Sequence, residues 1–335
     1  MVNSKEYFID LALEKAWAYQ GLTYPNPPVG AVVTDNLNNF IAYGVHKRAG
    51  TPHAEVNAIK KAYFNLTKDK NILDIKDSKD IHNYLKLNHN GIFKDKNIYV
   101  TLEPCNHFGK TPPCSQLISK LGFKKVIIGT LDTNKKASGG VEFLEKQGLQ
   151  VEILESSTCK DLLEPFSSWQ KDNFIFFKLA MSNNGVIDGG TITSKTSREL
   201  VHKLRDRCDL LVIGGNTVRV DRPTLDARLC DGKAPDILIY SKAKEVDKNI
   251  SLFNVPNRRV YIEDDFERLK KYSFVMIEGG EGMLKATKEL VNHYLIFRSP
   301  HFKKGKAPKI DLRLKELNSS LIGEDRLTWF KKLDG

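Results

Sequence analysis

One histidine, one glutamate and two cysteines constrain this chain more than any other residues. His53 and Glu55 lie two positions apart, and Cys105 and Cys114 follow much later in the sequence. An imidazole and two thiolates suit Zn²⁺, and three protein ligands leave the fourth tetrahedral position open for water. A carboxylate near the metal can accept a proton from that water and pass it to a leaving nitrogen. The pattern predicts a catalytic zinc site with His53, Cys105 and Cys114 as ligands and Glu55 as the catalytic carboxylate.

The surrounding sequence places these residues at helix starts and strand ends. A Thr-Pro pair precedes a helical pattern of apolar residues, so His53 falls in its first turn. Residues 97–102 have the composition of a strand, which ends just before Cys105. Cys114 precedes a helix predicted over residues 115–121, and helix N-termini favour the thiolate form that binds metal. The ligands are therefore expected on helix starts at the ends of strands.

Composition and charge limit the other function classes. With 335 residues, 41% of them hydrophobic, the chain is long enough for two globular domains. Its five cysteines show no paired spacing beyond the zinc pattern, which indicates a reducing compartment and predicts a cytoplasmic protein. The N-terminus lacks an apolar signal core and no apolar run reaches membrane-spanning length, so no membrane partner is expected. The net charge of +11 is compatible with binding of nucleic acid, with binding of a phosphorylated small molecule, or with a basic surface that binds neither. Because the sequence contains no visible RNA-binding motif, no nucleic-acid partner is expected.

Strands and helices alternate through the first half of the chain. A proline-rich loop over residues 24–30 enters a strand, a turn follows, and a second strand leads to the zinc helix. Residues 65–96, rich in Lys, Asp and Asn, are expected to form an insertion with a weak helix over 81–87. The alternation predicts a three-layer α/β domain over residues 1–155, followed by a linker over 156–172.

A second alternation begins near residue 173. It starts with a strand over residues 174–180, and a later strand over 209–213 runs into Gly214-Gly215. Another apolar strand, over 274–277, runs into a Gly-Gly turn and a helix. Such a turn offers exposed backbone N–H groups and a positive dipole end to a phosphate, although a plain tight turn has the same sequence. A second α/β domain is therefore expected over residues 173–335.

The first half contains several short motifs that together resemble one family, the bifunctional pyrimidine deaminase/reductase of riboflavin biosynthesis. Cytidine-deaminase-type enzymes carry H-x-E followed by P-C-x-x-C, whereas eight residues separate the two cysteines here. That longer gap, with its Gly-Lys-Thr-Pro-Pro run, distinguishes the family from tRNA adenosine and cytidine deaminases. The motifs are Pro25–Gly30, His46–Gly50, His53–Glu55, Thr101–Cys105 and Gly109–Cys114.

The resemblance implies a fold and a pair of reactions. The fold is a cytidine-deaminase-like α/β/α domain of three layers, joined to a dihydrofolate-reductase-like α/β domain. The implied reactions are zinc-dependent deamination of 2,5-diamino-6-(5-phosphoribosylamino)pyrimidin-4-one and reduction of the ribosyl group to ribityl with NADPH. Zn²⁺ and NADPH are the implied cofactors, a phosphorylated pyrimidine is the implied ligand, and a homo-oligomer, dimer or tetramer, is expected.

The resemblance also implies binding residues in each half. Expected substrate residues are Asn26, His46, Lys110 and Thr111 in the deaminase half, and Arg205, Leu225, Arg228 and Glu278 in the reductase half. Expected cofactor residues are Ala180, Thr217, Asp221, Ser241, Gly280, Glu281, Gly282, Met283, Leu284, Lys285 and Ala286. Arginines suit a ribose phosphate because they supply charge-assisted donors in a planar fork.

The reductase half departs from the family pattern, in which Ser-Leu-Asp-Gly is followed by Trp-Ile-Thr. Asn184 replaces the aspartate, Thr191 replaces the tryptophan, and Glu281 replaces a proline near the expected phosphate site. One alternative is therefore a monofunctional deaminase with a relic reductase domain. A second is a nucleic-acid (tRNA) deaminase with an appended domain, and a third is a non-enzymatic zinc protein that does not depend on Glu55.

Overall fold

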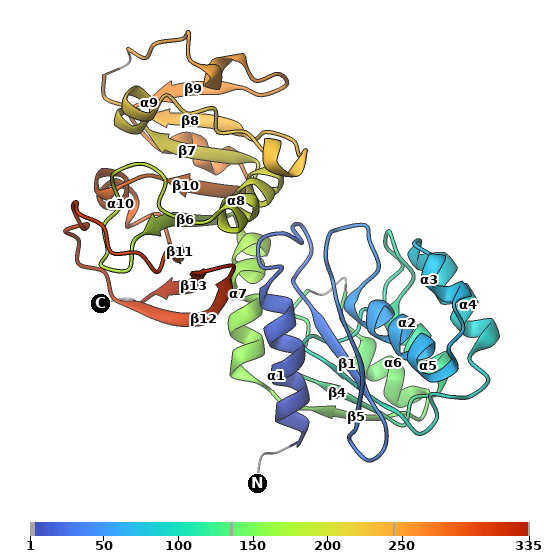
Figure 1. Cartoon of the computed structure of the whole chain (residues 1–335). Helices are drawn as coiled ribbons and strands as arrows, with labels where there is room; N and C mark the ends of the chain where they lie inside the picture. Colours follow the sequence, from blue (N-terminus) through green and yellow to red (C-terminus); the bar gives the residue numbers. More distant parts are fainter. Residues whose placement is uncertain (1–3, 135–136, 244, 334–335) are drawn as a thin grey trace. The chain divides into compact units, whose positions relative to one another are not determined.

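The chain divides into two compact units, Met1–Phe166 and Ser167–Gly335. The computed structural model describes residues 4–134, 137–243 and 245–333 (Figure 1). The boundary between the units falls inside helix α7, Ser157–Lys171, so most of the segment expected to be a linker is helical. The reason is that Cys159, Leu162 and Leu163 are buried and share one helix face.

The N-terminal unit is built on one mixed sheet whose described strands follow the order β2-β1-β3-β4-β5. β1 pairs antiparallel with both β2 and β3, and β3, β4 and β5 run parallel. The strands are β1 Gly30–Thr34, β2 Phe40–Val45, β3 Asn97–Val100, β4 Lys125–Ile128 and β5 Gln150–Ile153.

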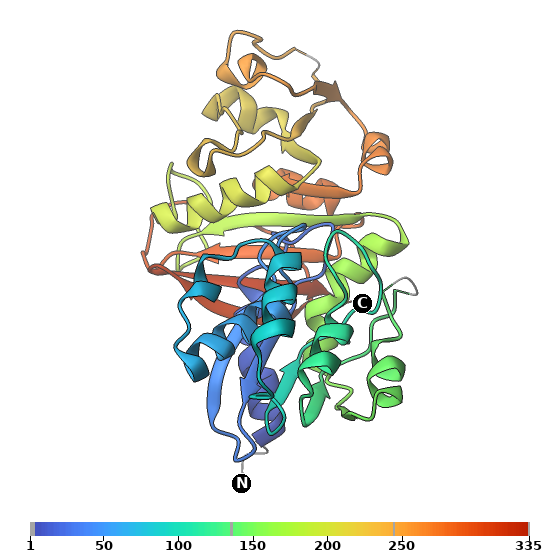
Figure 2. The ribbon, with the colours of Figure 1, turned by 90° about the vertical axis from the view of Figure 1, so that its right-hand side faces the viewer.

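Helices cover both faces of this sheet, as the alternation predicts. On one face Phe8 of α1, Ser4–Trp17, contacts Tyr99 of β3, with ring centroids 5.1 Å apart. Ile98 and Val100, the neighbours of Tyr99 in β3, belong to the buried core on the other face. That second face, turned toward the viewer in Figure 2, carries α2 Ala54–Thr67, α4 Ser78–Asn88, α5 Cys114–Leu121 and α6 Gly140–Lys146. The expected three-layer α/β/α domain is confirmed.

The segment expected as an insertion forms a packed extension of the second helical layer. It contains the short helix α3, Asn71–Asp74, and α4, which begins after Asp77, whose carboxylate accepts hydrogen bonds from two backbone N–H groups. Ile72, Ile81 and Leu85 are fully buried in the same core as α2. This burial explains why a segment rich in charge is ordered.

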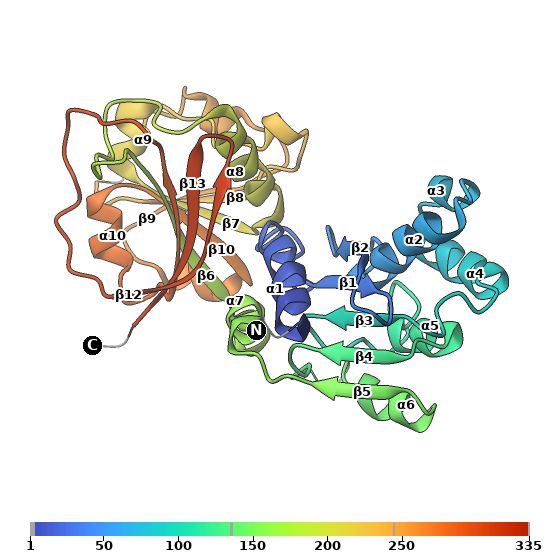
Figure 3. The ribbon, with the colours of Figure 1, turned by 60° about the horizontal axis from the view of Figure 1, so that its bottom comes forward.

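The C-terminal unit contains a larger sheet whose described strands follow the order β12-β13-β11-β6-β10-β7-β8-β9. The strands from β11 to β9 in this order are parallel, and the hairpin β12–β13, labelled in Figure 3, adds to β11 in the antiparallel direction. The bounds are β6 Phe174–Met181, β7 Leu210–Gly214, β8 Asp236–Tyr240, β9 Val260–Glu263, β10 Phe274–Glu278, β11 His293–Arg298, β12 Leu314–Ile322 and β13 Asp325–Lys332.

Each face of this larger sheet has its own packing. Phe177 and Ile277 lie in one core cluster with Met283 of α10. The alternate residues Phe176 and Phe274 stack on the opposite face, with ring centroids 5.7 Å apart. Besides the end of α7, the described residues of this unit form the helices α8 Lys195–Arg207, α9 Gly215–Asp221 and α10 Glu281–Thr287. The 3-10 turns occupy Arg228–Cys230, Ser251–Asn254 and Glu267–Lys271.

The parallel strands fix where a ligand can bind. The carboxyl ends of β6, β7, β8 and β10 meet at one edge of the sheet, and the segments after these strands lie together there. No helix in the described parts of the chain is both long and apolar enough to cross a membrane.

Candidate active sites

Three side chains converge in the N-terminal unit as the sequence predicts. Nδ1 of His53 lies 3.5 Å from Sγ of Cys105 and 3.5 Å from Sγ of Cys114, and the ligand atoms of the three residues lie within 4.8 Å of one another. Tetrahedral bonds of about 2.0 Å to nitrogen and about 2.3 Å to sulfur place N and S about 3.5 Å apart, so the cluster fits zinc. Among the described residues the cluster has no fourth protein ligand, which suits a catalytic metal.

Local structure explains this convergence. His53 has an extended backbone immediately before α2, and Cys114 is the first residue of α5. The backbone N–H of Cys114 donates to Sγ of Cys105 at 3.5 Å. A hydrogen bond from the Cys114 side chain, followed by the nearby His53, lowers the pKa of the Cys105 thiol despite its burial. A thiolate is the form that binds zinc, so these neighbours favour the metal-binding state of Cys105. The hydrogen bond with Cys105, together with burial, instead raises the pKa of the Cys114 thiol.

Thr111, which the resemblance to the family suggested as a substrate residue, orients the ring of His53. Oγ1 of Thr111 lies 3.2 Å from Nε2 of His53, and Thr111 is buried. A hydrogen bond at Nε2 leaves Nδ1 free to face the two sulfur atoms. Thr111 therefore supports the metal ligand, while Lys110 beside it is exposed.

Glu55 is buried on the first turn of α2 with only 3% of its surface exposed. Burial, reinforced by the adjacent Cys105 thiolate, raises the pKa of Glu55 to about 7. A cation held by the three ligands would oppose this rise. A buried carboxyl group beside the metal ligands is placed to accept a proton and to return it.

Asn26 and His46 contact each other beside the metal ligands. Nδ1 of His46 lies 3.3 Å from the carbonyl oxygen of Pro52, and its Nε2 lies 3.1 Å from Nδ2 of Asn26. A consistent arrangement has His46 Nδ1–H donating to Pro52 and Asn26 donating to Nε2. Burial, with a further contribution from His53, lowers the pKa of His46 to about 4, so the ring is neutral. The ring centroid of His46 lies 5.1 Å from that of His53. His46 and its partner Asn26, both predicted from the sequence, therefore lie beside the metal ligands.

In the C-terminal unit, the expected cofactor residues occupy the carboxyl edge of the sheet. Ala180 lies near the end of β6, Thr217 and Asp221 lie in α9 after β7, and Ser241 directly follows β8. The segment from Gly280 to Ala286 forms the turn after β10 and most of α10. A Cβ added to Gly282 would meet no atom within 4 Å, because this part of the first turn of α10 is exposed. Met283 and Leu284 are buried in the core, which leaves only their backbone for a cofactor.

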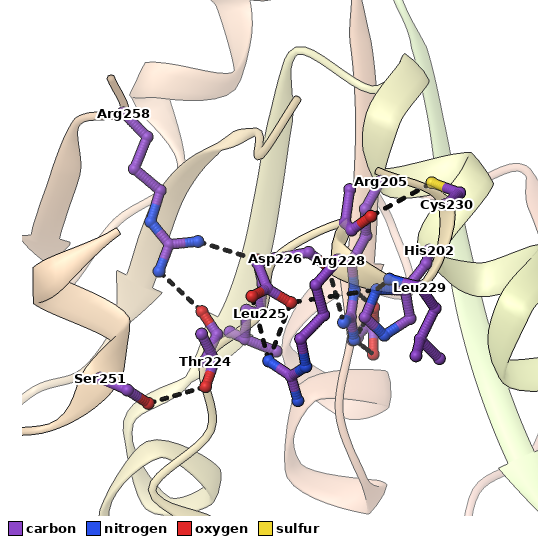
Figure 4. Close-up of polar contacts among 12 residues, drawn as sticks. His202, Arg205, Thr224, Leu225, Asp226, Arg228, Leu229, Cys230, Ser251 and Arg258 are labelled. Atoms are coloured by element: carbon purple, nitrogen blue, oxygen red, sulfur yellow. Dashed lines mark hydrogen bonds and ion pairs between the residues drawn. The ribbon is translucent and has the colours of Figure 1, made fainter. Parts of the chain in front are cut away.

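The expected substrate residues of this unit also come together. Arg205 of α8 donates from Nε and Nη2 to the carboxylate of Glu278 at 3.0 and 3.1 Å. Its Nη1 donates to the carbonyl oxygen of Asp226 at 3.3 Å, which brings the loop holding Leu225 and Arg228 beside α8 (Figure 4). Burial raises the pKa of Glu278, but the charges of Arg205 and Lys178 outweigh burial and the net shift is downward.

Comparison with known proteins identifies the family. Residues 2–130 match the cytidine and deoxycytidylate deaminase zinc-binding region, and residues 173–303 match the RibD C-terminal domain. The riboflavin biosynthesis protein RibD of Aquifex aeolicus is 31% identical over 375 aligned positions, which cover 97% of this chain and 98% of that protein. The chain belongs to the RibD family of riboflavin-biosynthesis proteins. RibD of Mycobacterium tuberculosis strain H37Rv is 29% identical and covers 92% of this chain and 89% of that protein.

Solved RibD structures share the fold over nearly the whole chain. A Thermotoga maritima protein described as a diaminohydroxyphosphoribosylaminopyrimidine deaminase/5-amino-6-(5-phosphoribosylamino)uracil reductase has 27% identity and a TM-score of 0.67, covering 98% of this chain and 99% of that one. Acinetobacter baumannii RibD, with 22% identity and a TM-score of 0.65 over 99% of each chain, shows the same fold.

Membership of the RibD family decides between the functional alternatives. The protein is a bifunctional enzyme of riboflavin biosynthesis, with a zinc-dependent deaminase domain and a reductase domain that uses NADPH. A tRNA deaminase with an appended domain, a monofunctional deaminase with a relic domain and a non-enzymatic zinc protein are not favoured, because the similarity extends through both domains.

Glu281 and Asn184, two residues that depart from the RibD pattern, each form contacts with nearby residues. The carboxylate of Glu281 forms an ion pair with Lys285 one turn later in α10, which offsets its negative charge beside the expected phosphate site. Asn184 donates to the carbonyl oxygen of Lys303 at 2.9 Å and accepts from its backbone N–H at 3.0 Å. An aspartate at position 184 could not make the first of these bonds, so the asparagine suits this chain's loop.

Sequence reasoning missed two residues that support the deaminase site. Glu103, inside the Thr101–Cys105 motif, accepts hydrogen bonds from the backbone N–H groups of Gly139 and Val141, both at 3.0 Å. Asn57 donates to the carbonyl oxygens of Val45 and Pro52, both at 2.9 Å, and so fixes the loop that carries His46. Glu103 could have been noticed because it is a carboxylate within a recognised motif, whereas nothing in the sequence marks Asn57.

Proposed function

We propose that the N-terminal unit deaminates 2,5-diamino-6-(5-phosphoribosylamino)pyrimidin-4-one and that the C-terminal unit reduces the ribosyl group of the product with NADPH. The observation that carries the first step is the buried Glu55 beside the His53, Cys105 and Cys114 cluster. The description of the related T. maritima protein supports the substrate and both reactions.

In the deaminase half, Glu55 carries the proton transfers. Zinc held by His53, Cys105 and Cys114 would supply a water molecule with a lowered pKa. Glu55 accepts a proton as the water oxygen adds to the ring carbon that bears the exocyclic amine, and this proton passes to the adjacent ring nitrogen. Glu55 then carries the remaining hydroxyl proton to the departing ammonia. The C–N bond breaks, a C=O bond replaces it, and no net proton remains on Glu55.

The remaining deaminase residues hold the substrate. Asn26 and His46 present polar atoms beside the metal ligands, where they can bind the ring or the ribose. Lys110 is exposed on the loop between the two cysteines and can meet the phosphate as a point charge. Thr111 acts through His53, because its hydroxyl lies within hydrogen-bonding distance of that ring.

In the reductase half, NADPH would supply a hydride to the open-chain ribose carbon. The role of the protein would be to hold the cofactor and the substrate in position for that transfer. Backbone groups from Gly280 to Ala286 are proposed to bind the cofactor phosphates, with Ala180, Thr217, Asp221 and Ser241 lining the rest of its site. Arg205, Leu225, Arg228 and Glu278 are proposed to bind the phosphorylated pyrimidine. The two arginines favour its phosphate through charge-assisted hydrogen bonds.

We assign the deaminase domain to residues 1–155, the connecting segment to 156–172 and the reductase domain to 173–335. A cytoplasmic location is supported by five cysteines that are all unpaired. A homo-oligomer is proposed on the resemblance to the family alone.

The experiment that tests the proposal uses the zinc-loaded chain and the diaminopyrimidinone phosphate. Without NADPH, the expected product by mass spectrometry is the deaminated pyrimidine alone. With NADPH, the deaminated and reduced product should replace it. A zinc-loaded protein that leaves the amine intact would contradict the deaminase assignment, and accumulation of the unreduced product with NADPH present would contradict the reductase assignment.

A further inference from the structure

The loop over residues 224–228 carries two of the proposed substrate residues in an uncommon backbone conformation. Leu225 has a φ of 54°, in the left-handed region that L-residues rarely adopt, and its side chain is 7% exposed. Arg228 begins the 3-10 turn that follows. Such a conformation persists only when surrounding contacts hold it, so the groups that fix this loop control where Leu225 and Arg228 lie.

A half-buried arginine holds the loop from one side. Nη1 of Arg258, a residue just before β9, donates to the carbonyl oxygen of Leu225 at 2.8 Å. Its Nη2 donates to the carbonyl oxygen of Thr224 at 2.7 Å and also to that of Leu252. Figure 4 shows the Arg258 guanidinium directed at this loop. A second tie is the hydrogen bond between the hydroxyls of Thr224 and Ser251, at 2.7 Å.

The opposite side of the loop faces the proposed substrate residues. The carbonyl oxygen of Asp226 accepts from Arg205, and its carboxylate accepts from Nη1 of Arg228 at 3.0 Å. Nδ1 of His202 lies 3.9 Å from the same carboxylate. The short run from Thr224 to Asp226 is thus held by Arg258 on one side and contacts Arg205 and Arg228 on the other (Figure 4).

We propose that Arg258 is a positioning residue of the reductase substrate site. It holds the carbonyl groups of Thr224 and Leu225 so that Leu225 and Arg228 face the phosphorylated pyrimidine, and it does not itself touch substrate or cofactor. The role depends on the planar fork of the guanidinium, which serves several carbonyl oxygens at once, whereas a lysine ammonium is a point charge. The inference rests on the proposed reductase function and adds a residue outside the family motif.

The test compares Arg258→Ala with Arg258→Lys and with Arg259→Ala as the matched control. Arg259 is the adjacent arginine, but its exposed side chain pairs with Asp236 at 2.9 Å rather than with the loop. Steady-state reduction is measured with the pre-deaminated substrate and NADPH, each varied in turn. Deaminase activity of the same samples and the thermal unfolding curve report folding of the two units.

Arg258→Ala is expected to raise the KM for the pyrimidine about tenfold or more, because charge-assisted hydrogen bonds to the loop are lost. The KM for NADPH should stay within about twofold, Arg258→Lys should recover part of the loss, and Arg259→Ala should match wild type. A pyrimidine KM in Arg258→Ala equal to that of Arg259→Ala, or an equal rise in both KM values, overturns the role. If Arg258→Ala fails to fold, a folded Arg258→Lys with the wild-type pyrimidine KM overturns it.

The same measurements separate this role from the proposed function. Failure of the wild-type protein to reduce the pyrimidine rejects the reductase assignment and the role of Arg258 together. Turnover by wild type with an unchanged KM in Arg258→Ala rejects the role of Arg258 alone.

Discussion

Arg205 and Glu278 form a buried bidentate ion pair, with Nε–Oε1 and Nη2–Oε2 distances of 3.0 and 3.1 Å. Their side chains are only 12% and 11% exposed, and Nζ of Lys178 lies 3.8 Å from the same carboxylate. Two cations around one carboxylate leave a net positive charge at this edge of the sheet. The pair therefore holds Arg205 in place while the site still attracts an anionic substrate.

Removing Arg205 should destabilise the C-terminal unit as well as weaken substrate binding. Arg205→Ala leaves Glu278 buried with only the more distant Lys178, at an expected cost of about 3 kcal/mol. The double variant with Glu278→Gln should recover part of that loss, because the unpaired charge is gone. Urea unfolding of the two single variants and the double variant measures the coupling energy, and purely additive effects would show that the pair contributes nothing.

Glu55→Gln should bind zinc but fail to deaminate. Glutamine preserves the shape of the side chain and cannot accept the water proton, so a loss of about 10²-fold or more is expected. Reduction of pre-deaminated substrate by the same variant should match wild type, since the proposed reductase residues lie in the other unit. Zinc content and both activities are measured on one preparation, and near-normal deamination at full zinc content would remove Glu55 from the mechanism.

The ion pair between Glu281 and Lys285 should matter for NADPH. Lys285→Ala removes the paired ammonium from the Glu281 carboxylate beside the expected phosphate site and leaves the weaker contribution of Lys309. The KM for NADPH should therefore rise severalfold, because like charges repel. Adding Glu281→Gln should reverse that rise. The effect should shrink at high salt because both side chains are partly exposed. An identical KM in all variants would place the cofactor phosphates elsewhere.

Asn184→Asp, which restores the family residue, should loosen the loop that follows β6. The aspartate cannot donate to the carbonyl oxygen of Lys303, and its charge would face that oxygen instead. Hydrogen exchange of residues 182–193 and 301–307 should become severalfold faster, and reduction should slow. Unchanged exchange would mean that the remaining contacts between these segments are sufficient, including the bond from Lys303 Nζ to Gly189.

His293 should make the C-terminal unit sensitive to acid. It is buried, its Nε2 has no partner among the described residues, and burial, then Lys331, lowers its pKa to about 4. Since the unfolded side chain has a pKa of about 6.5, the unfolded state binds more protons between pH 6.5 and 4. Stability should therefore fall across this window as pH decreases, by up to about 3 kcal/mol.

The matched variants are His293→Leu and His301→Leu, the second at an exposed position. His293→Leu should flatten the dependence of the unfolding midpoint on pH between 6.5 and 4, and His301→Leu should leave it unchanged. Equal slopes in wild type and His293→Leu would assign the acid sensitivity to other groups.

The sequence alone predicted the zinc ligands and much of the framework around them. His53, Cys105 and Cys114 could be predicted because zinc binds only certain side-chain atoms, which few residue types supply. The elements α2, β3 and α5 could be predicted because the spacing of apolar residues is a local property of the sequence. The same reasoning predicted β6, β7 and β10, whose apolar runs are buried on both faces. The hairpin β12–β13 was not predicted, because its strands are partly exposed and mix charged with apolar residues.

Tertiary structure decided the contacts between segments far apart in the chain. Arg258 is hydrogen-bonded to Leu225, Arg205 to Glu278, and Thr111 lies within hydrogen-bonding distance of His53. No pattern in the sequence around these residues predicts which partner each one contacts. A side chain's chemistry fixes what it can donate or accept, but strand order and helix packing fix which groups lie within hydrogen-bonding distance of it. The residues proposed to perform the chemistry could therefore be predicted from the sequence, while those that hold them in place became visible only when the chain was folded.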